Sequence, residues 1–173
     1  MLNTVWLVPA LPLAGFLLLV LFGRRLAEPK AGWLAATMCG SSFFVTLLVF
    51  LDMVSKNAEE RSHVVRVFSW IPVGSLQVDL AFLADQLSIT MALFITGIGT
   101  LIHLYAVGYM HGDLKFSKFF IYLNLFVFSM LMLVLGENLL VTFLGWEGVG
   151  TCSYFLISFW HTRDSAATAG KKA

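Results

Sequence analysis

Residues 138–160, NLLVTFLGWEGVGTCSYFLISFW, decide the fold that the sequence predicts. At about 1.5 Å per residue, a helix of this length crosses the roughly 30 Å apolar core of a bilayer. Its one charged residue is Glu147, about 13 Å along the helix axis from its start. A carboxylate at that depth costs about 2–3 kcal/mol to insert, so it is rarely kept without a use. Glu147 is therefore either a proton or ion site or a structural hydrogen bond between packed helices.

The composition of the whole chain points to a membrane protein. Of its 173 residues, 59% are hydrophobic and only 12% are charged, which is too little charge for a surface that faces water. Four further apolar segments are expected to span a membrane, at residues 4–23, 31–51, 84–110 and 118–135. The sequence thus predicts an all-α polytopic membrane protein with about five transmembrane helices. No basic run with interleaved aromatic residues indicates binding to nucleic acid.

The placement of lysine and arginine predicts an orientation with the N-terminus outside and the C-terminus inside. In that orientation only Lys56, Arg61 and Arg66 lie outside, of 11 basic residues in all. The others lie inside: Arg24, Arg25, Lys30, Lys115, Lys118, Arg163, Lys171 and Lys172. Residues 161–173 are expected to form a polar tail on the inner side.

The one long polar segment, residues 52–83, is expected to hold an external β-hairpin. In residues 76–82 large apolar side chains alternate with Gln77, Asp79 and Ala81, which is the period of a strand with one apolar face. Residues 63–71 are rich in strand-forming types, and residues 72–75 carry a turn signal. An isolated hairpin is marginally stable in water, so this one is expected to pack on helix ends or on a neighbouring subunit.

The fifth predicted helix carries the candidate chemistry. Four polar residues recur on it at spacings of four, three and four, so they share one face: Glu147, Thr151, Tyr154 and Ser158. A carboxyl beside hydroxyls could hold water and pass protons, although polar residues at a helix interface have the same pattern. Small residues around the carboxyl let other backbones approach closely, so we expect this helix to be buried in protein.

Other polar residues have less specific interpretations. His103 could relay protons, because its unperturbed pKa is near neutral, or it could simply bond a neighbouring helix. Asp85 is predicted to stabilise the start of the third helix, and Asn124 could bond across helices. Cys39 and Cys152 are predicted to be free thiols inside the membrane, and no Cys/His cluster indicates a metal site.

These residues resemble a known family, the largest antiporter-like subunit of respiratory complex I, called chain L in bacteria and chain 5 in mitochondria. The similarity runs from about residue 79 to the end and is most specific around Glu147. The matching stretches are GWEGVG (145–150), CSY (152–154), FW (159–160), DQLS (85–88), LIHLY (101–105), GYM (108–110) and FFIYLNLF (119–126). Thr151 and Ser158 stand where the family pattern has Leu and Gly, which leaves the assignment intact.

The resemblance implies a proton-translocating membrane-arm subunit of NADH:quinone oxidoreductase. In the family the fifth-helix glutamate, here Glu147, pairs with a lysine on a broken seventh helix, and the pair helps to pass protons when quinone reduction drives the cycle. The resemblance also implies that the chain is a fragment ending after the fifth helix. Residues 1–110 would be peripheral helices with the external hairpin. Residues 111–173 would begin an antiporter-like repeat and end in a cytoplasmic or matrix tail.

The resemblance implies partners and location as well. No redox chemistry is expected in this chain, since NADH, FMN, iron–sulfur clusters and quinone would bind other subunits. The expected partners are other complex I membrane subunits, the lipid bilayer and protons. The expected location is a bacterial cell membrane, with the mitochondrial inner membrane as the alternative. The residues expected to support the site by packing around the carboxyl are Trp146, Gly148, Gly150, Thr151 and Tyr154.

Two other functions stay open at this stage. The first is a large subunit of a multi-subunit Na⁺/H⁺ antiporter, which shares the scaffold and the Trp–Glu pair but has no redox link. The second is a membrane scaffold that translocates nothing, in which Glu147 is only a packing hydrogen bond. The Gly148-Val149-Gly150 sequence after the glutamate favours the complex I branch.

Overall fold

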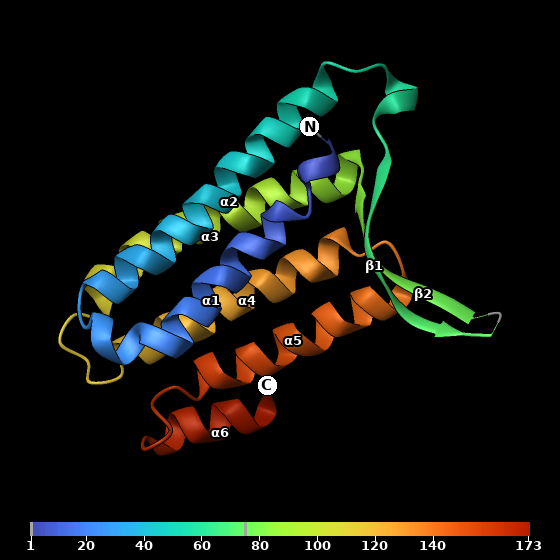
Figure 1. The fold of residues 1–173 in the computed structure, drawn as a ribbon. Coiled ribbons are helices and arrows are strands. Elements are labelled where there is room, and N and C mark those ends of the chain that lie inside the picture. The colour runs from blue at the N-terminus through green and yellow to red at the C-terminus, as the bar shows by residue number, and fades with distance from the viewer. Residues whose placement is uncertain (1, 75) are drawn as a thin grey trace.

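The computed structural model describes residues 2–74 and 76–173, and within them five helices are long and apolar enough to cross a membrane, as the sequence predicts. Figure 1 shows their arrangement. The elements in chain order are η1 (Leu2–Thr4), α1 (Leu7–Leu26), α2 (Lys30–Val54), η2 (Ala58–Glu60), β1 (His63–Val73), β2 (Leu76–Ala84), α3 (Gln86–Tyr109), α4 (Phe116–Leu135), α5 (Leu139–Ile157) and α6 (Asp164–Lys172).

The segment predicted as a polar tail, residues 161–173, forms a helix over most of its length, α6, which was not predicted from the sequence. Three alanines in this segment favour the helical state. Asp164 lies in its first turn, and Lys171 and Lys172 lie in its last, so all three charges suit the helix dipole. The helix folds back along the end of α5, where a Cβ added at Gly170 would lie 2.6 Å from Ser158 Cβ.

Helix α4 is central to the bundle, because it contacts α1, α2, α3 and α5. Helix α5 lies at the edge and packs mainly on α4 (Figure 1). The buried apolar side chains form two clusters along the bundle. One is centred on residues such as Val8, Ile89 and Leu131, and the other on Leu19 and Phe120. The core therefore sits among α1 to α4, and α5 adds one face to it.

The predicted hairpin is confirmed, with β1 and β2 paired antiparallel. Val78 and Phe82 are buried on its apolar face, as the alternation predicts. The turn is shorter than the predicted residues 72–75, because residues 72 and 73 still pair with β2. Ser75 lies outside the described residues. The hairpin packs on a helix connection: Glu137 N–H donates to Ala81 O at 3.1 Å.

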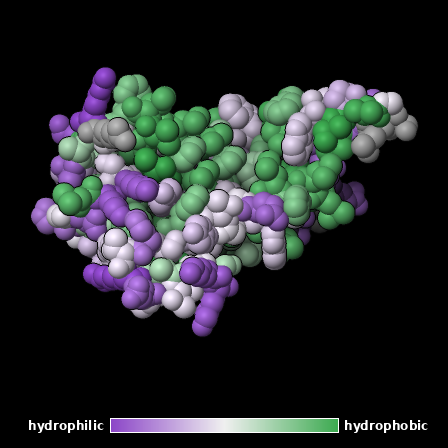
Figure 2. All heavy atoms as spheres, turned by 90° about the horizontal axis from the view of Figure 1, so that it is seen from below, coloured by the Kyte–Doolittle hydropathy of each residue, from purple (hydrophilic) through white to green (hydrophobic). Residues whose placement is uncertain are grey.

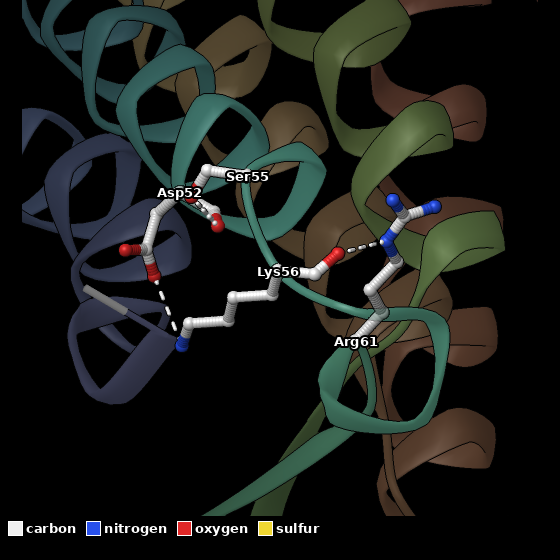
Figure 3. Close-up of polar contacts among 4 residues, drawn as sticks. All are labelled: Asp52, Ser55, Lys56 and Arg61. Carbon is white, nitrogen blue, oxygen red and sulfur yellow. Dashed lines mark hydrogen bonds and ion pairs between the residues drawn. The ribbon is translucent and has the colours of Figure 1, made fainter.

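The segment between α2 and the hairpin is held by contacts to the end of α2 (Figure 3). Lys56 Nζ lies 3.3 Å from Asp52 Oδ2, one helical turn earlier. The Arg61 guanidinium reaches back, and its Nε donates to Lys56 O at 2.9 Å. Ser55 Oγ donates to Asp52 O at 2.7 Å. These bonds fix the direction in which the chain leaves the helix and enters β1.

The opposite end of the bundle, reached by the α1–α2 and α3–α4 loops and α6, is rich in basic residues. We call it the basic end, and its described basic side chains are Arg25, Lys30, Lys115, Lys118, Arg163, Lys171 and Lys172. Figure 2 shows hydrophilic residues gathered at this end of the face seen from below, whereas hydrophobic residues cover much of the rest toward the hairpin. Which side of a membrane the basic end faces stays a prediction from the charge bias.

Candidate functional site

Helix α5 begins with a side-chain cap and ends with a backbone bond. The Asn138 side chain accepts the N–H of Val141 at 3.1 Å, as expected for an N-cap residue. At the other end Ser158 N–H donates to Tyr154 O at 3.0 Å. The helix therefore starts one residue later and ends three residues earlier than the predicted span of 138–160. Glu147 lies near its middle.

One side of α5, which we call the packed face, approaches α4 through glycines. A Cβ added at Gly145 would lie 2.4 Å from Leu133 N, so the two backbones are in direct contact there. A Cβ at Gly148 would lie 2.5 Å from Ser129 Oγ. Small residues allow this closeness between membrane helices. Cys152 is fully buried on the same side.

Glu147 lies on a different side of α5, which we call the open face. At about 100° per residue, Glu147 points some 160° away from Gly145, and its side chain is exposed. Gly150 is on this side too, and a Cβ there would meet nothing within 4 Å. The described part of the chain therefore leaves Glu147 uncovered, and whether other protein buries it stays a prediction. The small residues belong to two faces, and only the packed face is covered by the described part of the chain.

Thr151 and Tyr154 share the open face with Glu147, as the spacing predicts, and both are exposed. Trp146, next to the carboxyl, is also exposed, at 67%. Ser158 does not extend the polar stripe, because its hydroxyl donates to the Tyr154 backbone oxygen. The stripe that the structure brings together is thus one carboxyl followed by two hydroxyls.

A second polar group is buried between α3 and α4, away from the open face. His103 is fully buried, and its Nδ1 lies 2.7 Å from Gly99 O. A carbonyl can only accept, so Nδ1 carries the hydrogen in the neutral ring. Nε2 then accepts from Asn124 Nδ2 at 3.3 Å. The predicted bond of Asn124 across helices is confirmed, while the role of His103 in proton transfer stays a prediction.

Gly15 on α1 completes this group and was not singled out from the sequence. A Cβ there would lie 2.6 Å from Asn124 Oδ1. That oxygen is buried and has no hydrogen-bond partner among the described residues. The amide orientation follows from the His103 bond, which takes the nitrogen side. The glycine within the apolar stretch 7–22 of α1 was the sequence signal for this contact.

Carboxylates hold the loops of the basic end together. Glu28 in the α1–α2 loop accepts the N–H of Gly112 at 3.0 and 3.1 Å. Asp113 accepts the N–H of Lys115 at 2.7 Å and the indole N–H of Trp160 at 3.0 Å. Those two hydrogen bonds, the Lys115 backbone bond first, lower the pKa of Asp113 below its ordinary value of 3.8. The chain just beyond α5 is thereby tied to the start of α4.

The remaining predicted residues are found as follows. Asp85 caps α3, because Ser88 N–H donates to Asp85 Oδ1 at 2.7 Å and Ser88 Oγ accepts from Asp85 N–H at 2.9 Å. Cys39 and Cys152 are both free and buried. Among residues 2–74 and 76–173, no group of three or more His, Cys, Asp and Glu side chains is placed to hold a metal ion.

Two family descriptions match the chain. Residues 70–120 match "NADH-Ubiquinone oxidoreductase (complex I), chain 5 N-terminus". Residues 136–173 match "NADH:quinone oxidoreductase/Mrp antiporter, TM". The first match covers the end of β1, β2 and α3, and the second covers α5 with Glu147 and α6. The chain is therefore a multi-pass membrane protein of the antiporter-like class that complex I and Mrp antiporters share.

Within that class, the chain belongs to the family of the large antiporter-like subunit of complex I, and it corresponds to the N-terminal portion. It is 48% identical over 168 residues to NADH-quinone oxidoreductase subunit L of Mycobacterium tuberculosis (strain ATCC 25618 / H37Rv), covering 97% of this chain and 26% of the relative. It is 39% identical over 171 residues to subunit L of Escherichia coli (strain K12), covering 99% and 28%. The chain thus spans about a quarter of the length of these relatives.

A solved structure has the same fold. The chain is similar to a chain in the structure of the Mrp complex from Dietzia sp. DQ12-45-1b, with a TM-score of 0.71 and 27% identity, covering 90% of this chain and 16% of that one. The arrangement of the five helices and the hairpin is thus shared with an antiporter complex.

Proposed function

We propose that this chain is part of a proton-translocating membrane subunit of an NADH:quinone oxidoreductase, in which Glu147 takes up and passes on a proton. The observation that carries the proposal is the exposure of Glu147 on the open face of α5. Structural hydrogen bonding within these helices does not explain the carboxyl, because the packed face, not the open face, meets α4.

A carboxyl in the middle of a membrane helix needs protein or water around it, since lipid cannot solvate it. In this proposal the open face is covered by further protein, which Gly150 allows to approach closely. Among the residues that the structure describes, none is a lysine or arginine at the depth of Glu147, because the charged residues of α1, α2 and α4 lie at or near the helix ends. The resemblance implies that a lysine on a later helix would pair with Glu147 and change its proton affinity.

The test is Glu147→Gln in the complete protein within its membrane assembly. Membrane vesicles would be given NADH, and both the rate of NADH oxidation and the accompanying proton uptake would be measured. We expect fewer protons moved per NADH oxidised, because glutamine cannot exchange a proton. Glu137→Gln is the matched control, since Glu137 is an exposed carboxyl in the α4–α5 connection and should leave the ratio unchanged. An unchanged ratio and rate in Glu147→Gln would exclude the proton role.

The proposal extends to the surroundings of the chain. The redox cofactors, namely NADH, FMN, iron–sulfur clusters and quinone, would bind other subunits, and this chain would contact other membrane subunits of the complex. Two bacterial relatives support a bacterial cell membrane as its location. His103 is a weaker candidate for a proton carrier, because both of its ring nitrogens already have partners in Gly99 and Asn124.

A Na⁺/H⁺ antiporter subunit is the second candidate function, favoured by the shared fold with the Mrp complex. The two candidates differ in what drives the proton. An antiporter would move protons in vesicles when a sodium gradient is imposed, without NADH. Proton movement that requires NADH and ignores sodium supports the oxidoreductase.

A further inference from the structure

The basic end of the bundle contains a cavity that the proposed proton site does not use. It lies between the start of α4 and the end of α5 and has a volume of about 220 Å³. Its polar lining comes from both helices and the segment after α5: Lys115, Lys118, Tyr122, Tyr154, Ser158 and His161. Both helices are long enough to span a membrane, so a cavity at their ends lies at the depth of the lipid headgroups.

The charge lining the cavity is positive. Lys115 and Lys118 are three residues apart at the start of α4, so they lie on the same side of that helix. No aspartate or glutamate lines the cavity among the residues that the structure describes. Within the same described ranges, neither lysine forms an ion pair. The positive end of the α4 dipole adds to this potential.

Asp113 is the acidic residue that most directly opposes this charge. Asp113 lines a neighbouring cavity on the α1 side of the loop, together with Glu28, and both lysines line that cavity as well. The two oxygens of Asp113 are engaged by the Lys115 backbone and by the Trp160 indole. Asp113 therefore offsets part of the charge on Lys115, although it is not among the residues that line the cavity between α4 and α5.

The walls of the cavity are aromatic, which suits a ligand that is partly apolar. Tyr122 of α4 stacks on Phe155 of α5 with ring centroids 4.9 Å apart. Lys118 Nζ lies 5.7 Å above the Tyr122 ring. Phe159 closes the floor, where it meets Phe119 edge to face. Rings with a polar tip next to lysines are typical of the zone where a membrane meets water.

We propose that this cavity binds the phosphate of an anionic phospholipid headgroup. Lys115 and Lys118 pair with the phosphate, and the aromatic walls contact the upper part of an acyl chain. Basic pockets between transmembrane helices at headgroup depth have the charge and location that such lipids need. The proposal is independent of any proton role of Glu147.

The test measures lipid retained by the 173-residue chain. The chain would be placed in nanodiscs of phosphatidylcholine that contain increasing amounts of phosphatidylglycerol. The protein would then be released from the nanodiscs in the mass spectrometer, and the phosphatidylglycerol that stays bound to it would be counted by native mass spectrometry. Lys115→Gln with Lys118→Gln should bind phosphatidylglycerol roughly tenfold more weakly, since each lysine near a headgroup contributes to the attraction. Arginine at both positions should preserve binding. Far-ultraviolet circular dichroism would check that the helices are intact.

The matched control is Lys171→Gln with Lys172→Gln, which removes the same charge from the same end but outside the cavity. It should retain the lipid. An equal loss in this control would show diffuse attraction to the basic end and overturn the proposal. Undiminished binding in the Lys115/Lys118 variant would also overturn it. Displacement of the lipid by millimolar inorganic phosphate would show a site for free anions instead, which would again count against a lipid site.

Discussion

The two faces of α5 differ in every property that governs helix association. On the packed face, Gly145 and Gly148 bring the helix so close to α4 that a single added carbon would overlap it. On the open face, Glu147 and Thr151 are exposed and Gly150 has free space around it. One face of the helix is thus packed against α4, and the face about half a turn away is not covered by the described residues.

Small residues around a membrane carboxyl do not by themselves show that the carboxyl is buried. Glycine permits close packing, but its presence does not identify the helix that packs against it. Gly148 and Gly150 are two residues apart and therefore on different sides of the helix. One of them contacts Ser129, and the other contacts nothing in the described chain. Burial of one face therefore gives no information about the burial of a carboxyl on another.

The largest effect is expected from Gly145→Ala on the packed face. The new Cβ would lie 2.4 Å from Leu133 N and 2.7 Å from Leu133 Cα. Backbone atoms cannot move aside as a side-chain tip can, so α5 must shift away from α4. We expect a loss of about 3 kcal/mol in the free energy of unfolding, the upper range for overpacking. Unfolding in mixed micelles of mild detergent and dodecyl sulfate would measure it. A loss below about 0.5 kcal/mol would show that the two helices are not in backbone contact.

Much of the fold follows from sequence, because lipid imposes simple demands on a chain. Apolar length predicts the spans, and the alternation of residues 76–82 predicts a strand whose Val78 and Phe82 are indeed buried. The exact helix ends do not follow so simply. They depend on capping residues. Asn138 fixes the start of α5 because its side chain accepts the Val141 N–H, and the apolar pattern alone would allow the helix to begin at a neighbouring residue. Helix α6 was missed because its alanines and lysines are also common in polar tails.

The candidate site was harder to predict, because periodicity gives the face of a residue but not the occupant of that face. The spacing correctly places Glu147, Thr151 and Tyr154 together. It cannot show that Ser158 turns its hydroxyl back to the helix, since that depends on where the helix ends. Likewise, the sequence suggests separate bonds for His103 and Asn124. Only the crossing of α3 and α4 shows that they bond each other.

A smaller effect on stability is expected from replacing Asp113, which ties the segment after α5 to the start of α4. The pKa of this carboxyl is lowered in the folded chain, so the folded state favours its charged form. Its contribution to stability is complete above the unfolded pKa and is lost as the pH falls through the lower, folded pKa. Asp113→Asn should therefore lower stability near neutral pH, by less than about 1 kcal/mol because the group is near the surface. The difference from wild type should vanish in acid. A difference that persists unchanged below pH 3.8 would contradict the tether.

No loss of stability is expected from Gly150→Ala on the open face, which is the counterpart of Gly145→Ala. The added carbon would meet nothing within 4 Å in the 173-residue chain. Alanine also restricts the unfolded backbone more than glycine, so the variant should be stabilised by about 0.5–1 kcal/mol in the same micelle assay. A loss as large as that of Gly145→Ala would mean that α5 has no open face. In the complete protein the proposal for Glu147 predicts the opposite sign, because a helix lying over the carboxyl would meet the new methyl group. Proton transport that falls in the assembly while the 173-residue chain gains stability would place the missing partner of Glu147 on the open face.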